Sequence, residues 1–321
     1  MNEKIPINNL VQNNRIEIPV KLYDVKRQYT FEQKITKGEE TTDIRYDFTA
    51  NFLRNKSDMS MFCRINRISP IYINDEEADL IIDELAYETG KVFYPLVVQM
   101  DDFGKFQKII NYTEISERWK KQREKISQYF AGDDADKYLA LMDQVIRNEA
   151  MINKTFRHDL FINTFFAPVY KRYPLSAYKK NYDMYFPLAG KARSVIFSID
   201  DTLSDFLTDT GSVEILQSGK CTDERSAFEI EWQYDKASSE GQTPVEINYT
   251  GRYTLEAQSK LIHSIETKWE FTGEISKITE IKITPSEGFN PNQSFIVEDY
   301  MDSSKKESGF WKDFWDVLRG K

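Results

Sequence analysis

The sequence predicts an α+β protein in which two regions of antiparallel β-hairpins and meanders flank a central helical segment. Long stretches alternate apolar and polar residues, as half-buried strands do, both before residue 70 and after residue 190. Between them, residues 114–166 carry apolar side chains at helical spacing. A C-terminal amphipathic helix is predicted at the end of the chain, after a polar linker.

The first β region is expected to consist of long hairpins with one face toward water. Alternation begins at Tyr29–Ile35 and resumes over Thr42–Leu53. Met59–Ile68 is predicted to be the return strand, across a polar turn. A further hairpin is predicted for Val92–Asn111, where Gly104 supplies the positive φ that such turns favour.

Four helices are expected in the first part of the chain, at residues 75–88, 114–130, 134–150 and 154–166. Asn74 is the predicted N-cap of the first, because Glu77 three residues later completes a capping box. The other three would follow one another closely and end before Pro168.

The second β region is expected to contain six strands. They are Ser194–Ile199, Ser212–Gln217, Ala227–Tyr234, Val245–Leu255, Lys260–Thr272 and Lys277–Thr284, the last three forming a meander. Ile247–Tyr253 matches the alternation of Tyr46–Phe52, so internal duplication is one hypothesis. The predicted organisation is therefore residues 15–175, residues 176–285, and a linker with its helix at residues 286–321.

Composition argues against several kinds of partner and location. The formal net charge of −9 disfavours nucleic acid and anionic membrane as general partners. Met1–Asn14 lacks the apolar stretch of a secretory signal, so the cytoplasm is expected, with the periplasm as the alternative if a signal peptide has been removed. Cys63 and Cys221 are expected to be free thiols, a disulfide between them being the less favoured alternative.

The sequence contains no recognisable catalytic motif. It has no Gly-x-Ser-x-Gly elbow, phosphate-binding loop or dinucleotide-binding turn, and His158 and His263 lie far apart. Three acidic groups each have a structural explanation: Asp101-Asp102 in a turn, Asp133–Asp136 at a helix N-terminus, and Asp200-Asp201 at a strand end. The prediction is a protein that is not an enzyme and that uses no metal and no cofactor.

The C-terminal helix, Ser308–Gly320, is the strongest candidate for a binding site. Its apolar stripe consists of Phe310, Trp311, Phe314, Trp315 and Leu318. Each side chain would contribute roughly 1.5–3 kcal/mol on burial, so the stripe is expected to dock on this chain's own body or on a partner. The alternatives are core completion, a protein partner, self-association and contact with a membrane surface; a short, charge-balanced helix fits the last poorly.

Two functions follow from these observations. The first is a non-catalytic bacterial interaction or assembly component that binds a protein partner through the C-terminal aromatic helix. The second is a carrier whose curved sheet encloses a lipid-like or other apolar ligand. The meander Gly251–Thr272 resembles, in pattern, the half-barrel sheets of bacterial lipoprotein-carrier proteins and related bacterial families. That resemblance implies the carrier function and transfers no functional residues, whereas the helix and the expected location favour the interaction component.

Overall fold

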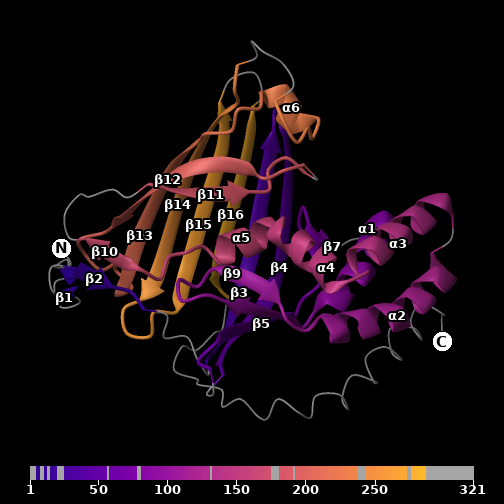
Figure 1. The fold of residues 1–321 in the computed structure, drawn as a ribbon, viewed down its shortest axis with the longest axis horizontal. Helices are drawn as coiled ribbons and strands as arrows, with labels where there is room; N and C mark the ends of the chain where they lie inside the picture. Colours follow the sequence, from indigo (N-terminus) through magenta and orange to yellow (C-terminus); the bar gives the residue numbers. More distant parts are fainter. Residues whose placement is uncertain are drawn as a thin grey trace. The chain divides into compact units, whose positions relative to one another are not determined.

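The structure is a computed structural model, and the chain divides into two units, residues 1–289 and 290–321. All described residues lie in the first unit (Figure 1). They are residues 5–7, 11–12, 15–19, 25–55, 58–77, 81–130, 132–174, 181–190, 192–237, 243–272 and 276–286. The predicted C-terminal helix therefore lies outside the described residues.

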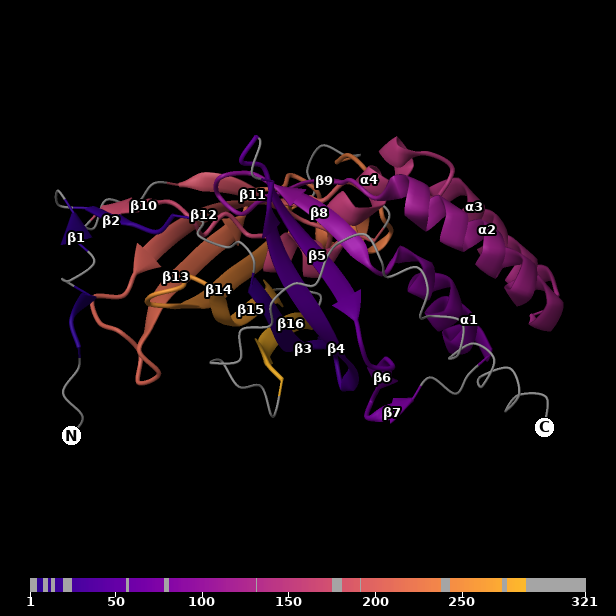
Figure 2. The ribbon, with the colours of Figure 1, turned by 90° about the horizontal axis from the view of Figure 1, so that it is seen from below.

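One antiparallel sheet of 13 strands dominates the described part of the chain (Figures 1 and 2). From edge to edge its main path is β11 (Tyr182–Phe186), β12 (Val195–Leu203), β13 (Ser212–Cys221), β14 (Glu246–Glu256), β15 (Ile262–Thr272), β16 (Lys277–Pro285), β3 (Val25–Lys37), β4 (Glu40–Arg54), β5 (Met61–Arg67), β8 (Leu96–Met100) and β9 (Phe106–Ile109). The short strands β6 (Tyr72–Ile73) and β7 (Glu76–Glu77) branch from β4. The predicted α+β class is confirmed.

The two β regions predicted from the sequence meet within this one sheet. β16 pairs with β3 along its whole length, from Lys277 opposite Lys37 to Pro285 opposite Tyr29. A separate three-stranded sheet joins β1 (Val11–Gln12), β2 (Arg15–Glu17) and β10 (Arg172–Pro174). Each of the two sheets thus combines strands that are far apart in the sequence.

The helical segment lies between β9 and β10 in the sequence, with α1 (Ile81–Gly90) and the 3-10 turn η2 (Lys91–Phe93) before it. It comprises α2 (Tyr112–Tyr129), α3 (Asp133–Val145), α4 (Glu149–Arg157) and α5 (Leu160–Phe165). The predicted helices over 134–150 and 154–166 are divided differently, because Asn148 and Asp159 each cap a new helix. Their side chains accept hydrogen bonds from the amides of Met151 and Ile162.

The predicted helix at 75–88 is wrong at its start. Asn74 and Asp75 have positive φ angles of 52° and 65° and form the turn between β6 and β7. The Asn74 side chain accepts a hydrogen bond from the amide of Asp43 at 2.9 Å, which fastens this turn to β4. Asn74 is therefore a turn residue, and α1 begins at Ile81.

The predicted strand Ala227–Tyr234 is also wrong, because residues 227–231 form the short helix α6 (Ala227–Glu231). Ser226 caps it: its hydroxyl accepts from the amide of Glu229, and the Glu229 carboxylate accepts from the amide of Ser226. This reciprocal capping box stabilises a helical turn where the apolar alternation had indicated a strand.

Aromatic side chains fill the inner face of the sheet, where α5 packs. Phe48 of β4 lies 5.1 Å from Phe161 and 5.5 Å from Phe165, measured between ring centroids. At the other end of the sheet, Phe186 of β11 lies 4.9 Å from Trp269 of β15. Since β11 and β15 are separated by three strands in the sheet order, the sheet curls so that its β11 edge covers its own inner face (Figure 1).

Cys63 is buried and Cys221 is partly buried, and both are free, as predicted. None of the helices in the described ranges is both long and apolar enough to cross a bilayer.

Gly104 provides a test of how closely a turn packs against this core. It has φ +79°, and a Cβ there would lie 2.5 Å from Cδ2 of the buried Tyr170 ring. We expect Gly104→Ala to lower the free energy of unfolding by about 2–4 kcal/mol, from backbone strain plus overpacking. Gly38→Ala is the matched control, because Gly38 has φ +62° and nothing within 4 Å of the added Cβ. Urea denaturation measures both, and equal losses would contradict the close packing.

Candidate functional site

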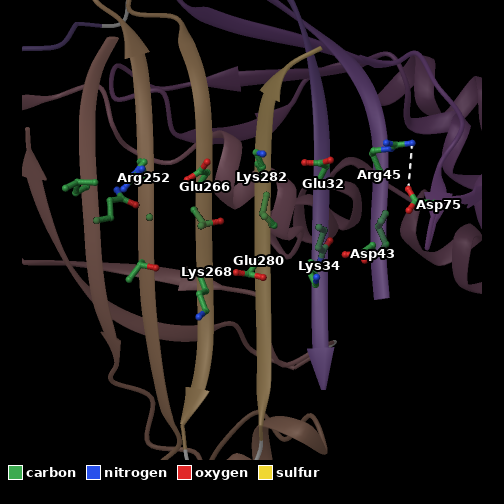
Figure 3. Close-up of a pocket in the computed structure, with 18 residues that line it drawn as sticks. Glu32, Lys34, Asp43, Arg45, Asp75, Arg252, Glu266, Lys268, Glu280 and Lys282 are labelled. Carbon is green, nitrogen blue, oxygen red and sulfur yellow. Dashed lines mark ion pairs between the residues drawn. The ribbon is translucent and has the colours of Figure 1, made fainter. Parts of the chain in front are cut away.

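Two surface features are candidates for a functional site, and the larger is a hollow on the outer face of the sheet. This charged hollow has a volume of about 850 Å³ and spans strands β13, β14, β15, β16, β3 and β4 (Figure 3). The charged side chains that the strands contribute to it alternate with those that point into the aromatic core, because successive residues of a strand face opposite sides. The outer face therefore receives the polar residues of each strand.

Strand register arranges the charges of the hollow in alternating order. Two rows of directly opposed residues cross the sheet: Arg252, Glu266, Lys282, Glu32 and Arg45 form one, and Lys268, Glu280, Lys34 and Asp43 form the other. Asp75 extends the first row, its Oδ1 lying 4.0 Å from a terminal nitrogen of Arg45. Each neighbour across a strand pair has the opposite charge, an arrangement that stabilises antiparallel strands.

The charged hollow is consequently balanced, with five cationic and five anionic side chains among the ten labelled in Figure 3. A ligand of one strong charge gains little from such a surface, because every attractive group has a repulsive neighbour. An apolar ligand would have to displace water from ten ionised groups, which is unfavourable. The arrangement suits a solvated sheet face.

The second feature is an exposed aromatic cluster on and after α6. It consists of Phe228, Trp232 and Tyr234, which are 52%, 65% and 47% exposed. The Phe228 ring centroid lies 5.7 Å from that of Trp232 and 6.2 Å from that of Tyr234. Three neighbouring aromatic side chains held in water are uncommon on a surface without a binding role, because contiguous exposed apolar patches are costly.

A fully buried ion pair holds the aromatic cluster in place. Arg225 donates to both carboxylate oxygens of Asp223, at 2.8 and 2.7 Å, and to the backbone carbonyls of Tyr234, Arg193 and Ser194. Burial by itself would raise the pKa of Asp223, but the hydrogen bonds and charge of Arg225 hold that pKa below its ordinary value. The segment that carries the aromatic cluster is thus rigidly tied to the start of β12.

Of the three acidic groups singled out from the sequence, two have their predicted places. The Asp101 carboxylate accepts hydrogen bonds from the amides of Phe103 and Lys105 in the hairpin turn. Asp133, Asp134 and Asp136 lie in the first turn of α3. In the part of the chain that the structure describes, no three His, Cys, Asp or Glu side chains gather as metal ligands would.

The third group, Asp200-Asp201, was predicted to end a strand, and this is wrong because β12 continues to Leu203. Asp201 instead pairs with Lys171 inside the structure and accepts a hydrogen bond from the Tyr182 hydroxyl at 3.0 Å. Burial, followed by the charge of Asp201, raises the pKa of Tyr182. The Tyr182 hydroxyl therefore stays protonated at neutral pH, and the network fastens the loop after α5 to the sheet.

The histidines are far from one another, as the sequence indicated. His158 is the C-cap of α4, and its Nδ1 lies 2.9 Å from the carbonyl oxygen of Lys154. His263 lies on β15. Neither belongs to the charged hollow or to the aromatic cluster.

The binding residues predicted from the sequence, Phe310, Trp311, Phe314, Trp315 and Leu318, lie outside the described residues. The aromatic cluster of α6 was not predicted. Its signal was present in the sequence, because Ser226 and Glu229 have capping-box spacing and three aromatic residues follow within eight positions. The alternation of those aromatic residues indicated a strand and concealed the helix.

No protein-family model matches the chain, and no curated protein matches it. Among solved structures, one that concerns lipid–protein interactions in lipovitellin is similar, with a TM-score of 0.41 and 7% sequence identity. The match covers 82% of this chain and 25% of that chain, so this chain spans about a quarter of its length. At this TM-score the likeness is faint, and no residue role is taken from it.

The buried pair beneath the aromatic cluster leads to a prediction about stability. Arg225→Met leaves the Asp223 carboxylate buried without its partner, so we expect a loss of about 3–5 kcal/mol. The double variant Arg225→Met/Asp223→Leu should lose less than the sum of the two single losses. Because the folded pKa of Asp223 is depressed, its contribution is present above about pH 4 and lost as the pH falls through the folded value.

Urea denaturation at pH 7 and at pH 3 measures these effects, and the double variant should lose the part of the pH dependence that Asp223 causes. Arg252→Met is the control, because Arg252 pairs with Glu214 on the outer face and should contribute under about 1 kcal/mol. Additive losses, or an unchanged pH dependence in the double variant, would contradict a coupled pair.

Proposed function

We propose that this protein is a non-catalytic binding component whose ligand is another protein. The aromatic cluster Phe228, Trp232 and Tyr234 is the observation that supports this function most directly. Tryptophan and tyrosine are enriched among the residues that dominate protein–protein binding, because each buries a large area with few rotatable bonds. Three such side chains within seven residues offer a compact anchor.

Rigidity of the segment also favours binding. The capping box of Ser226 and Glu229 fixes the start of α6, and the buried Arg225 fixes the carbonyl of Tyr234 at the end of the cluster. A partner that docks on a surface already held in its bound geometry does not have to order it first, so less free energy is lost on association.

The C-terminal helix predicted from the sequence is proposed as a second contact with the partner. Its stripe of four aromatic residues and one leucine provides anchors at helical spacing, the pattern by which a helix fills an apolar groove in another protein. Self-association through the same stripe is the variant of this proposal in which the partner is a second copy.

The experiment compares partner capture by the full chain, by Trp232→Ala, and by a truncation that lacks residues 306–321. We expect Trp232→Ala to weaken binding by at least about 30-fold, the effect of a residue worth 2 kcal/mol or more. The truncation should weaken binding separately, and analytical ultracentrifugation of the same proteins would detect self-association. Binding constants are measured by calorimetry once the captured partner has been purified.

Tyr185→Ala is the matched control, because Tyr185 on β11 is 51% exposed and lies outside the aromatic cluster. Both exposed substitutions should change the free energy of unfolding by less than about 0.5 kcal/mol. Unchanged binding in both Trp232→Ala and the truncation would refute the proposal.

The alternative function is a carrier of an apolar ligand, which requires an apolar cavity. In the described ranges, rings such as those of Phe165 and Trp269 occupy the inner face of the sheet, and ten of the eighteen residues that line the larger hollow are charged. These observations favour the protein-binding function. Native mass spectrometry of the gently purified full chain should therefore find no bound lipid. A stoichiometric apolar ligand would favour the carrier function over the protein-binding function.

A further inference from the structure

A small cavity lies beneath α6, next to the aromatic cluster. It has a volume of about 250 Å³ and is formed by α6, the loop after β11, and the ends of β3, β15 and β16. Its apolar wall includes Leu188, Ala227, Ile230 and Phe271, and Lys37 and Lys277 also line it. We call this cavity the lysine pocket.

The register of the sheet places two like charges in this pocket. Lys277 of β16 is directly opposite Lys37 of β3, at the end of the pairing that joins the two β regions. Directly opposed residues point to the same face, and like charges in that relation destabilise a sheet. Such a pair therefore requires anionic groups nearby if it is to be stable.

One anionic group is already there. Oε1 of Glu231, on α6, lies 2.5 Å from Nζ of Lys37. Within the described ranges, Lys277 has no ion pair; its Nζ lies 5.3 Å from the ring centroid of Phe271. Partial burial, followed by the charge of Lys37, lowers the pKa of Lys277. The pocket thus holds two cations, one anion and free volume.

We propose that the lysine pocket receives a carboxylate side chain from an acidic segment of the protein partner and pairs it with Lys277. This inference rests on the proposed protein-binding function and identifies the chemistry of the partner. The pocket is smaller than the roughly 300–1,000 Å³ of sites for drug-sized ligands, so it suits a single side chain. A partner segment lying on Phe228 and Trp232 would be placed to insert that side chain beside Ala227.

Charge favours an acidic protein segment over an anionic membrane. Glu231 lies at the pocket, Asp235 follows the aromatic cluster, and the whole chain carries a net charge of −9. These charges repel an extended anionic surface, whereas a single carboxylate can reach Lys277, which has no ion pair among the described residues. A carboxylate held by an ammonium group in a partly desolvated pocket also forms a stronger hydrogen bond than one at an open surface.

The test uses three matched peptides and the full chain labelled with ¹³C and ¹⁵N at lysine. Acetyl-Glu-Phe-amide presents a side-chain carboxylate, acetyl-Gln-Phe-amide presents none, and acetyl-Gln-Phe with a free C-terminus presents a terminal carboxylate. Titrations follow the Lys277 signal by NMR, with Lys277→Arg used to assign it. We expect the first peptide to bind at least about tenfold more tightly than the second, the effect of one charge-assisted hydrogen bond.

Three variants test whether the preference for the acidic peptide depends on Lys277. Lys277→Met should abolish the preference for the acidic peptide and Lys277→Arg should retain it, while Lys34→Met should leave it unchanged because Lys34 lies on the opposite face of β3 in the charged hollow. Thermal unfolding verifies that each variant is folded. Binding of the acidic peptide should also raise the pKa of Lys277, because a carboxylate stabilises its charged form.

Several results would overturn the proposal. The first two are equal affinity for the acidic and neutral peptides, and no binding of either peptide. The third is tighter binding of the peptide with a free C-terminus than of the peptide with a glutamate side chain. The fourth is that phosphatidylserine vesicles bind in a Lys277-dependent way and the peptides do not bind. Because the peptides replace the natural partner, this test can fail while Trp232→Ala still weakens partner binding. It can also succeed where the partner experiment fails, so the two proposals are judged separately.

Discussion

The pairing of β16 with β3 is the contact on which the rest of the fold depends. It joins strands almost 250 residues apart in the sequence and turns two groups of hairpins into one sheet. Side chains of β3 add contacts to the strands beyond β16. Arg27 donates to both carboxylate oxygens of Glu256 on β14 at 3.0 and 3.1 Å, and the Tyr29 hydroxyl donates to the carbonyl of Ile262 on β15 at 2.7 Å. Such non-local pairing becomes favourable only when both halves are already ordered, so the fold is cooperative across the junction.

The curvature of that sheet separates the two faces by chemistry. The inner face is covered by α5 and by the β11 edge, so its aromatic residues are buried against one another. The outer face receives the alternate residues, and the same register that aligns the core places opposite charges side by side in the charged hollow. One strand pairing therefore determines both the core and a balanced outer surface, which leaves the ends of the strands as the place where charge is unbalanced.

Much of this architecture could be predicted from residue patterns, because alternation reports directly on strands with one wet face. Thr42–Leu53 and the meander after residue 245 were correct for that reason. Side-chain capping was harder to anticipate: Asn74 looked like a helix cap but is held by β4, while Ser226 begins a helix inside an alternating segment. Asp201 was assigned to a strand end, since its partners Lys171 and Tyr182 are distant in the sequence.

The aromatic cluster shows why a candidate site can be misread in the sequence even when its capping residues are present. A helix of five residues is far shorter than the roughly 12–15 residues needed for an isolated helix, so α6 exists because tertiary contacts hold it. Arg225 supplies those contacts from below, and Glu231 ties the helix to β3 through Lys37. Ala227, Ile230 and Glu231 of α6 also line the lysine pocket, so the cluster and the pocket share this one short helix. If the proposed function holds, a partner that contacts the aromatic cluster also meets the lysine pocket, and we infer that its specificity comes from matching both.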